Sequence, residues 1–226
     1  MQLEALLYSM QRFYTLEDCY VLYVNDFEER KLDYHSLDYP VTFIKQHDFK
    51  LDTEDIIRDS KQVTFLCDDD IFYQNCIIPS INQMETFSLR LGRIVTNKKQ
   101  FDYTISLDGN IFRTEDILPL MEDLEYSNPN QLEGALVPFQ HMFTMKWKRQ
   151  CLVGVPHNKV SDTSRCATSG AWSVEDLNSW YLKGYRLRNL YFENIKDVHA
   201  DIEFNMVSYA RKKEDRRTWD TSRSDA

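Results

Sequence analysis

The stretch VTFLCDDD, residues 63–70, joins a short apolar run directly to three consecutive aspartates. The run is β-branched and aromatic, which is typical of a buried strand, and it ends abruptly in charge. In an open α/β sheet, ligands bind just beyond the carboxyl ends of the strands. Adjacent carboxylates repel one another unless a cation neutralises them, and hard divalent cations prefer oxygen ligands. The stretch therefore predicts a cation site at Asp68 and Asp70, with a solvated acidic turn as the alternative.

Composition limits the kinds of partner that the chain can have. Its 226 residues, 42% of them hydrophobic and 13% aromatic, suffice for one domain with a sizeable core. The formal net charge of -9 argues against non-specific binding to nucleic acid or to anionic membranes. Phosphorylated ligands remain possible, because a bound divalent cation reverses the local sign of charge.

From its composition, we expect no targeting or membrane-anchoring segment in this sequence. No apolar run approaches the roughly 20 residues that span a bilayer, and the first residues lack the basic flank and apolar core of a signal peptide. The five cysteines are scattered without CxxC spacing, which argues against zinc and against a disulfide framework. Reduced thiols and a cytoplasmic location are therefore expected.

Short strands and helices alternate in the first part of the chain. In order, we expect a helix over 3–13, a strand over 19–24, a helix-compatible stretch over 27–37, a strand over 41–45, a helix over 53–60, a strand over 63–67 and a helix over 71–87. Thr53 is the expected N-cap of the third of these helical stretches. This alternation favours an α/β fold with a mainly parallel sheet covered by helices on both faces.

The second half has longer elements and ends in a charged tail. We expect a strand over 103–107, helices over 114–124 and 128–148, a strand over 151–155, a polar loop over 156–170, a helix over 174–185 and a strand over 198–206. Asn128-Pro129-Asn130 is a strong helix start. Residues 1–208 are therefore expected to form one domain, and residues 209–226 a flexible charged tail.

In this order of elements, the sequence resembles the GT-A family of nucleotide-sugar glycosyltransferases, in particular its bacterial family-2-like branch. The segments that carry the resemblance are DDD at 68–70, SLDGN at 106–110, NPNQLE at 128–133 and PHNKV at 156–160. The resemblance covers roughly residues 3–206. It implies a GT-A-like fold and the transfer of a sugar from a nucleoside diphosphate, UDP in the first place, to an acceptor hydroxyl, with inversion slightly favoured. Members of the family begin with a further strand, which holds the base and ribose, and this strand is expected to be missing here.

The resemblance also implies a metal site that holds the donor. Asp70 is the leading ligand of Mn²⁺ or Mg²⁺, and Asp68 is a second contact to the ion or to the ribose. The ion would stabilise the negative charge that builds on the departing diphosphate. Asp69 belongs to the same donor site or is an exposed turn carboxylate. His157 is the candidate third ligand, with His199 as its alternative.

Catalytic and donor-binding residues follow from the later segments. Glu133 is the candidate general base of an inverting enzyme, and we expect it in the first turn of its helix, where the helix dipole favours a carboxylate. Its structural alternative is a charge partner for the amides at the helix start. Asp108 is the rival base or a ligand of the donor sugar, and Gly109 allows a tight turn and close approach of the substrate. Two loop cations, Lys159 and Arg165, are candidates for screening the diphosphate, and a solvated loop charge is the alternative for both.

Two other functions compete with this hypothesis. A phosphatase of the haloacid dehalogenase type also ends a buried strand in DxD, but it places Thr or Val two residues later, where this chain has Phe72. It also carries a later Gly-Asp-x-x-x-Asp, which this sequence lacks. A non-catalytic, degenerate nucleotide-sugar-binding protein is the second rival: the missing first strand favours it, and the aspartate triplet and Glu133 oppose it.

Overall fold

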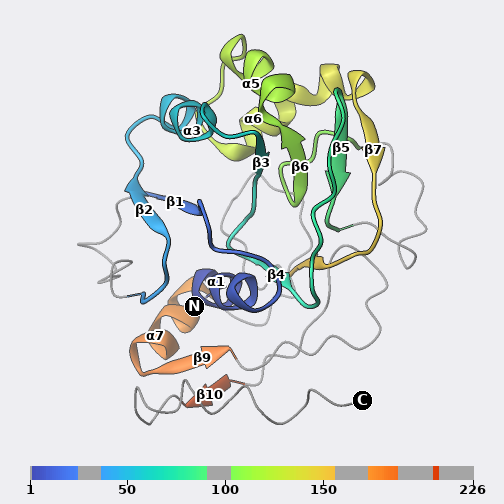
Figure 1. Ribbon diagram of the computed structural model, residues 1–226. Helices are drawn as coiled ribbons and strands as arrows, with labels where there is room; N and C mark the ends of the chain where they lie inside the picture. The colour runs from blue at the N-terminus through green and yellow to red at the C-terminus, as the bar shows by residue number, and fades with distance from the viewer. Residues whose placement is uncertain (1, 25–36, 91–102, 156–172, 188–205, 209–226) are drawn as a thin grey trace.

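A computed structural model describes residues 2–24, 37–90, 103–155, 173–187 and 206–208, and its elements mix helices with short strands (Figure 1). The helices are α1 (Gln2–Phe13), α3 (Phe49–Ile57), α5 (Thr114–Glu122), α6 (Pro129–Leu136), the 3₁₀ helix η2 (Val137–Met142) and α7 (Val174–Leu182). The strands are β1 (Tyr20–Tyr23), β2 (Thr42–Lys45), β3 (Gln62–Thr64), β4 (Asp70–Phe72), β5 (Glu85–Ser88), β6 (Asn110–Arg113), β7 (Thr144–Lys146), β8 (Leu152–Gly154), β9 (Tyr185–Leu187) and β10 (Met206–Ser208). The predicted α/β composition is thus confirmed.

The largest sheet has four strands in the order β3-β6-β5-β7. β6 runs antiparallel to both β3 and β5, whereas β7 runs parallel to β5. The remaining pairs are β1–β2, which is parallel, and β4–β8 and β9–β10, which are antiparallel. The sheets are therefore mixed and not mainly parallel as predicted. The physical reason is the turn at Asp108-Gly109, which returns the chain as β6 directly beside β3.

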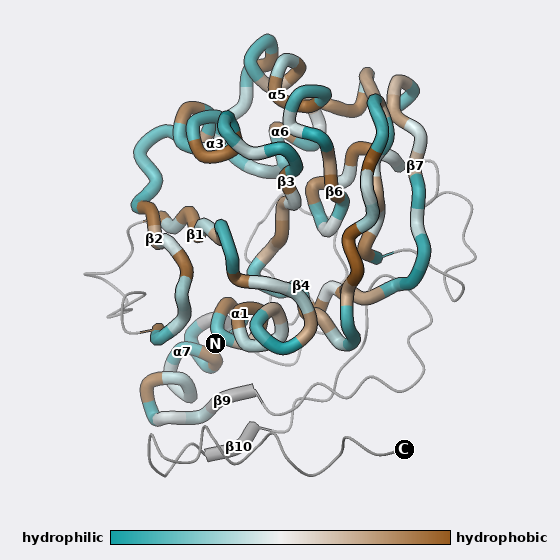
Figure 2. Tube along the Cα trace, in the orientation of Figure 1, coloured by the Kyte–Doolittle hydropathy of each residue, from teal (hydrophilic) through white to brown (hydrophobic). Residues whose placement is uncertain are grey.

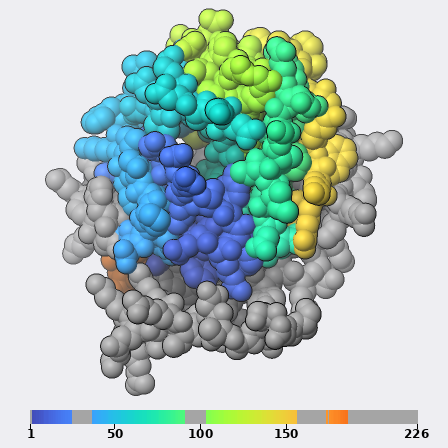
Figure 3. Space-filling model, viewed as in Figure 1, coloured from blue at the N-terminus to red at the C-terminus, as the bar shows by residue number. Residues whose placement is uncertain are grey.

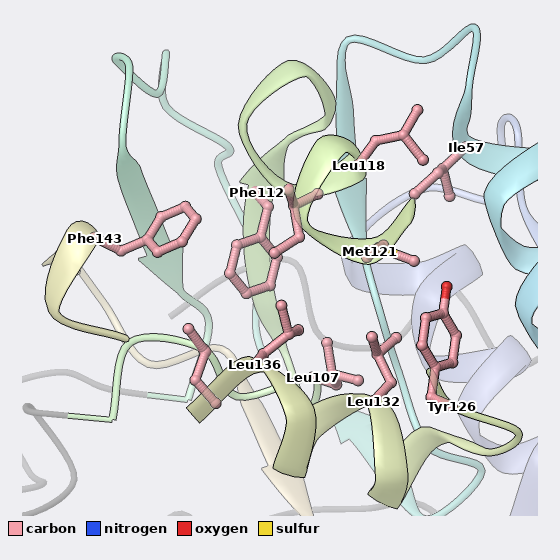
Figure 4. Packing of buried hydrophobic residues seen from close by; sticks show 11 residues of the cluster. Ile57, Leu107, Phe112, Leu118, Met121, Tyr126, Leu132, Leu136 and Phe143 are labelled. Carbon is pink, nitrogen blue, oxygen red and sulfur yellow. The ribbon is translucent and has the colours of Figure 1, made fainter. Parts of the chain in front are cut away.

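β6 separates two clusters of buried apolar residues. Side chains of successive strand residues point to opposite faces of a sheet, so Ile111 and Phe112 enter different clusters. The Phe112 cluster gathers residues of α3, α5 and α6 against β6, as Figure 4 shows. Its members are Ile57, Ile105, Leu107, Phe112, Ile117, Leu118, Met121, Tyr126, Leu132, Leu136 and Phe143. Hydrophilic and hydrophobic residues alternate along α3 and α5, as expected of helices with one buried face (Figure 2).

The Ile111 cluster packs α1 against β4, β5 and β8. Its members are Leu6, Leu7, Met10, Leu16, Phe72, Phe87, Leu89, Ile111, Cys151 and Leu152. Ser9 fixes the contact, since its hydroxyl donates to the Leu6 carbonyl over 2.7 Å and accepts from the Phe72 amide over 3.0 Å. The Tyr14 ring stacks on the Phe72 ring with centroids 4.8 Å apart. In the space-filling view, atoms of the N-terminal residues, in dark blue, border those of β5, in green (Figure 3).

Several predicted elements are confirmed, and others have shifted ends. α1, β1, β2, β8 and the start of α7 lie where the sequence predicts them. Ser173 and Asp176 form a reciprocal capping box at the start of α7. α3 begins earlier than predicted, because the Asp48 side chain accepts from the Leu51 amide and is the N-cap in place of Thr53, which is buried within the helix.

Two predictions of regular structure are wrong. Residues 71–87 form no single helix: β4 and β5 lie at the two ends of this stretch, with irregular chain between them that contains Pro79. Proline lacks the amide that a helix interior needs. Residues 103–107 form turns, because the Asn110 side chain donates to the Thr104 carbonyl over 3.2 Å and Thr104 Oγ1 donates to the Gln140 carbonyl over 2.6 Å.

The helix predicted over 128–148 starts as expected and ends early. Asn128 caps it by accepting from the Gln131 amide over 3.0 Å, and Pro129 occupies its first turn. α6 ends at Leu136, where η2 begins with Pro138 near its start, and β7 follows. The expectations for residues 27–36, 156–170 and 198–205 and for the tail at 209–226 fall outside the described residues. None of the described helices has the length and apolar character that a bilayer crossing requires.

Candidate functional site

The turn at Asp108-Gly109 is fixed between the chain that leaves β3 and the chain that leaves β5. The Gly109 amide donates to the Phe65 carbonyl over 3.0 Å, and the Leu89 amide donates to the Gly109 carbonyl over 2.9 Å. Gly109 has φ +80°, in the left-handed region that favours glycine. A Cβ atom at this position would overlap the Leu152 side chain. The prediction of a tight turn at Gly109 is therefore confirmed.

Asp70 is the first residue of β4, and its side chain is fully buried. Its Oδ2 accepts from the Cys67 amide over 2.9 Å, and its own amide donates to the Cys67 carbonyl over 3.1 Å. The acidic triplet is thereby bent into a tight turn that points the third carboxylate inward. Burial raises the pKa of Asp70 to about 7, and Asp69 adds to the rise, whereas the nearby Arg90 opposes it.

Asp70 and Asp108 meet at this turn, together with Cys67. One carboxylate oxygen of each aspartate and the Cys67 sulfur all lie within 4.8 Å of one another. Arg90 is buried as well and forms an ion pair with Asp108 Oδ2. Asp70 Oδ1 and Asp108 Oδ1 are buried and have no hydrogen-bond partner among the described residues.

This donor set fits a divalent cation. Two buried carboxylate oxygens without hydrogen bonds have a desolvation cost that a cation would offset. Carboxylate ligands suit Mg²⁺ and Mn²⁺. Desolvation of the sulfur and the neighbouring carboxylates raise the pKa of the Cys67 thiol well above its usual value, although the residue as a whole is exposed, so this sulfur is the weakest of the three donors. Asp70 and Asp108 are therefore the residues that would hold an ion.

The other residues of the aspartate triplet lie outside this cluster. Asp68 is exposed, and Asp69 is half-buried, with its backbone carbonyl accepting from the Val155 amide over 2.8 Å. The structure thus pairs Asp70 with Asp108, where the sequence paired it with Asp68. The difference arises because β4 begins at Asp70, and its inward-facing side chain meets the turn before β6.

Glu133 lies in α6, apart from the cluster of Cys67, Asp70 and Asp108. It does not lie in the first turn as predicted, since α6 begins at Pro129 and its first turn contains no acidic residue. The Tyr103 hydroxyl hydrogen-bonds its carboxylate; burial and this acidic neighbour raise the pKa of Tyr103. His157, Lys159 and Arg165, and the alternative ligand His199, lie outside the described residues.

Sequence reasoning missed Arg90 and Cys67. Residues 71–87 were predicted to form a helix, so no strand was expected directly before Arg90. The segment TFSL at 86–89 nevertheless has the β-branched and aromatic content of a strand. A cation directly after that strand was the available signal. Cys67 stands within the stretch that predicted the site, but it was assigned to the strand.

No family model, curated protein or solved structure matches this chain. Two surface hollows of the described residues lie away from the aspartates. One is lined by Gln11, Tyr14, Thr15, Leu16, Glu17 and Pro40, and the other by Pro79, Ser80, Ile81, Asn82, Glu85, Phe87 and Lys146.

Proposed function

We propose that this protein is a divalent-cation-dependent glycosyltransferase that moves a sugar from a nucleoside diphosphate, UDP in the first place, to an acceptor hydroxyl. One observation supports this proposal above the others: the carboxylates of Asp70, which is buried, and Asp108, which is half-buried, lie in one cluster. The two residues belong to separate segments of the four that carry the GT-A resemblance. If these segments act in one reaction, their residues must lie in one site.

Each residue has a proposed role in that reaction. Asp70 and Asp108 hold Mn²⁺ or Mg²⁺ through the two buried oxygens that have no hydrogen bond among the described residues. When bound, the cation supplies stabilisation of the negative charge on the diphosphate leaving group. Arg90 holds the Asp108 carboxylate in place through their ion pair. Glu133 is the proposed general base, and the Tyr103 hydroxyl hydrogen-bonds its carboxylate.

Calorimetric titration with Mn²⁺, followed by UDP, tests the cation site. The intact protein should bind Mn²⁺, and UDP should bind only when Mn²⁺ is present. Asp70→Asn keeps the shape of the side chain and its ability to accept from the Cys67 amide, but it should weaken Mn²⁺ binding at least about tenfold, because a charged ligand is lost. Asp59→Asn, at an exposed aspartate that follows α3, is the matched control and should bind as the intact protein does. Equal affinity in the intact protein and Asp70→Asn would refute the site.

One observation favours the alternative, a binding protein without turnover. Asp70 Oδ2 and Asp108 Oδ2 are already engaged by the Cys67 amide and by Arg90, which leaves one oxygen of each for a ligand. Release of UDP from a panel of UDP-sugars, with and without simple sugar acceptors, separates the two functions. An enzyme should release UDP, and Glu133→Gln should slow transfer while donor binding persists. Cation-dependent binding of UDP without any release would identify the binding protein.

A further inference from the structure

Two cysteines that the proposed function does not use lie beside each other in the Ile111 cluster. Cys151 directly precedes β8 and is buried, whereas Cys76 follows β4 and is half-buried. The pairing of β4 with β8 continues to this point, since the Tyr73 amide donates to the Cys151 carbonyl over 3.1 Å. The Cys76 amide donates to the Phe13 carbonyl over 2.9 Å, which fixes the Cys76 backbone at the end of α1.

The Cys76 and Cys151 side chains lie close enough in this cluster to interact. This contact lowers the pKa of Cys76, although burial opposes the change. Burial instead raises the pKa of Cys19 to about 11, and it raises the pKa of Cys67 well above its usual value. Cys76 therefore combines partial exposure with a lowered pKa, which are the two properties of a reactive cysteine.

We propose that Cys76 and Cys151 are a dithiol that small-molecule disulfides of the glutathione type oxidise to an intramolecular disulfide. The Cys76 thiolate attacks one sulfur of the small disulfide, whose S–S bond breaks and releases one thiolate. The Cys151 thiol then loses its proton to that thiolate, attacks the Cys76 sulfur and displaces the second small thiol. Two protein thiols are oxidised, and one small disulfide is reduced to two thiols.

The bond would join two segments that are distant in sequence and already adjacent in the fold. It would close a loop of more than 70 residues, from Cys76 to Cys151, across β5, β6, α5, α6 and β7. A cross-link of that span restricts the unfolded chain strongly, so oxidation should raise the Tm by about 5–10 °C. Both backbones are held before oxidation, that of Cys76 by its bond to Phe13 and that of Cys151 by its bonds to Tyr73 and Leu89.

Peptide mapping of the full chain tests the linkage directly. The protein is incubated with glutathione disulfide, its remaining thiols are blocked with N-ethylmaleimide, and it is cleaved before aspartate residues. Each cysteine then lies on its own peptide, with Cys76 in 70–101 and Cys151 in 123–161. The other three are found in 18–25, 59–67 and 162–175. We expect a 70–101/123–161 species that dithiothreitol removes, together with the rise in Tm.

Variants separate this linkage from random oxidation. Cys76→Ser and Cys151→Ala should abolish both the linked species and the rise in Tm, whereas Cys19→Ser, at another half-buried cysteine, should retain both. Mapping of the unmodified chain needs no variant, so a misfolded Cys151→Ala would not affect the test. The proposal fails if Cys76 stops at a mixed disulfide with glutathione, stays reduced, or links mainly to Cys19, Cys67 or Cys166.

Discussion

At the scale of the residue, Gly109 allows the candidate site to form. Gly109→Ala should lower the free energy of unfolding by about 3 kcal/mol or more, because the backbone has φ +80° and the added Cβ would overlap Leu152 and lie 3.0 Å from Arg90 Cγ. Gly184→Ala is the matched control, with φ +87° and open space at the Cβ position, and should cost only about 1 kcal/mol. Urea denaturation measures both values. Equal losses would show that the backbone conformation alone matters and that the close packing around Gly109 does not.

The reactivity of Cys76 is a second residue-scale prediction. A lowered pKa gives Cys76 a larger thiolate fraction at neutral pH, whereas Cys19, with a pKa of about 11, is almost fully protonated there. Iodoacetamide should therefore alkylate Cys76 at least about tenfold faster than Cys19 at pH 7.5, and the difference should shrink as the pH approaches 11. Both cysteines are half-buried, so access is comparable. Cys151→Ala should slow the alkylation of Cys76, and an unchanged rate would contradict the role given to the Cys151 side chain.

Residue types revealed part of the site before the structure did. Asp70, Asp108 and Gly109 stand out in sequence because charge and turn-forming residues directly follow apolar runs. Their partners do not stand out. Arg90 joins Asp108 only because β5 and β6 are neighbours, and Cys76 meets Cys151 only through the β4–β8 pair. Pairing between distant strands is set by tertiary packing, which local patterns do not encode.

At the scale of the element, Ser9 connects α1 to β4. Ser9→Ala should lower the free energy of unfolding by about 1–3 kcal/mol, because the Phe72 amide would lose its acceptor in a buried place. Ser80→Ala, at an exposed serine, should change stability by less than about 0.5 kcal/mol. Chemical denaturation followed by circular dichroism compares the two. A neutral Ser9→Ala would mean that water or a shifted backbone satisfies the amide.

Elements with clear end signals were the predictable ones. The capping residues Asn128 and Ser173 mark true helix starts, since each side chain accepts a backbone amide of the first turn. Helix ends were less predictable. The stretch 71–87 has helical spacing of apolar residues, but it forms no helix, because Pro79 lacks an amide and β4 pairs with β8. α6 ends at Leu136, before Pro138 of η2, although apolar periodicity continues beyond this point.

At the scale of the whole molecule, the alternation of strands and helices indicated the α/β composition but not the direction of the strands. Alternation predicts parallel strands only when each connection crosses over the sheet. Here β6 lies between β3 and β5 and runs antiparallel to both, so the centre of the sheet is antiparallel. The GT-A-like topology therefore remains a proposal supported by the order of motifs and by the pairing of Asp70 with Asp108.

The two buried clusters should unfold together, because neighbouring residues of β6 belong to different clusters. Met121→Ala in the Phe112 cluster and Leu7→Ala in the Ile111 cluster should each lower the free energy of unfolding by about 2–5 kcal/mol. Both changes should shift the whole transition, since Ile111 and Phe112 share one strand and cannot lose their packing separately. Urea unfolding followed by far-ultraviolet and near-ultraviolet circular dichroism should give coincident midpoints in the intact protein and in both variants. Two separate transitions, with Leu7→Ala moving only one of them, would show that the α1 side of β6 unfolds as a unit of its own.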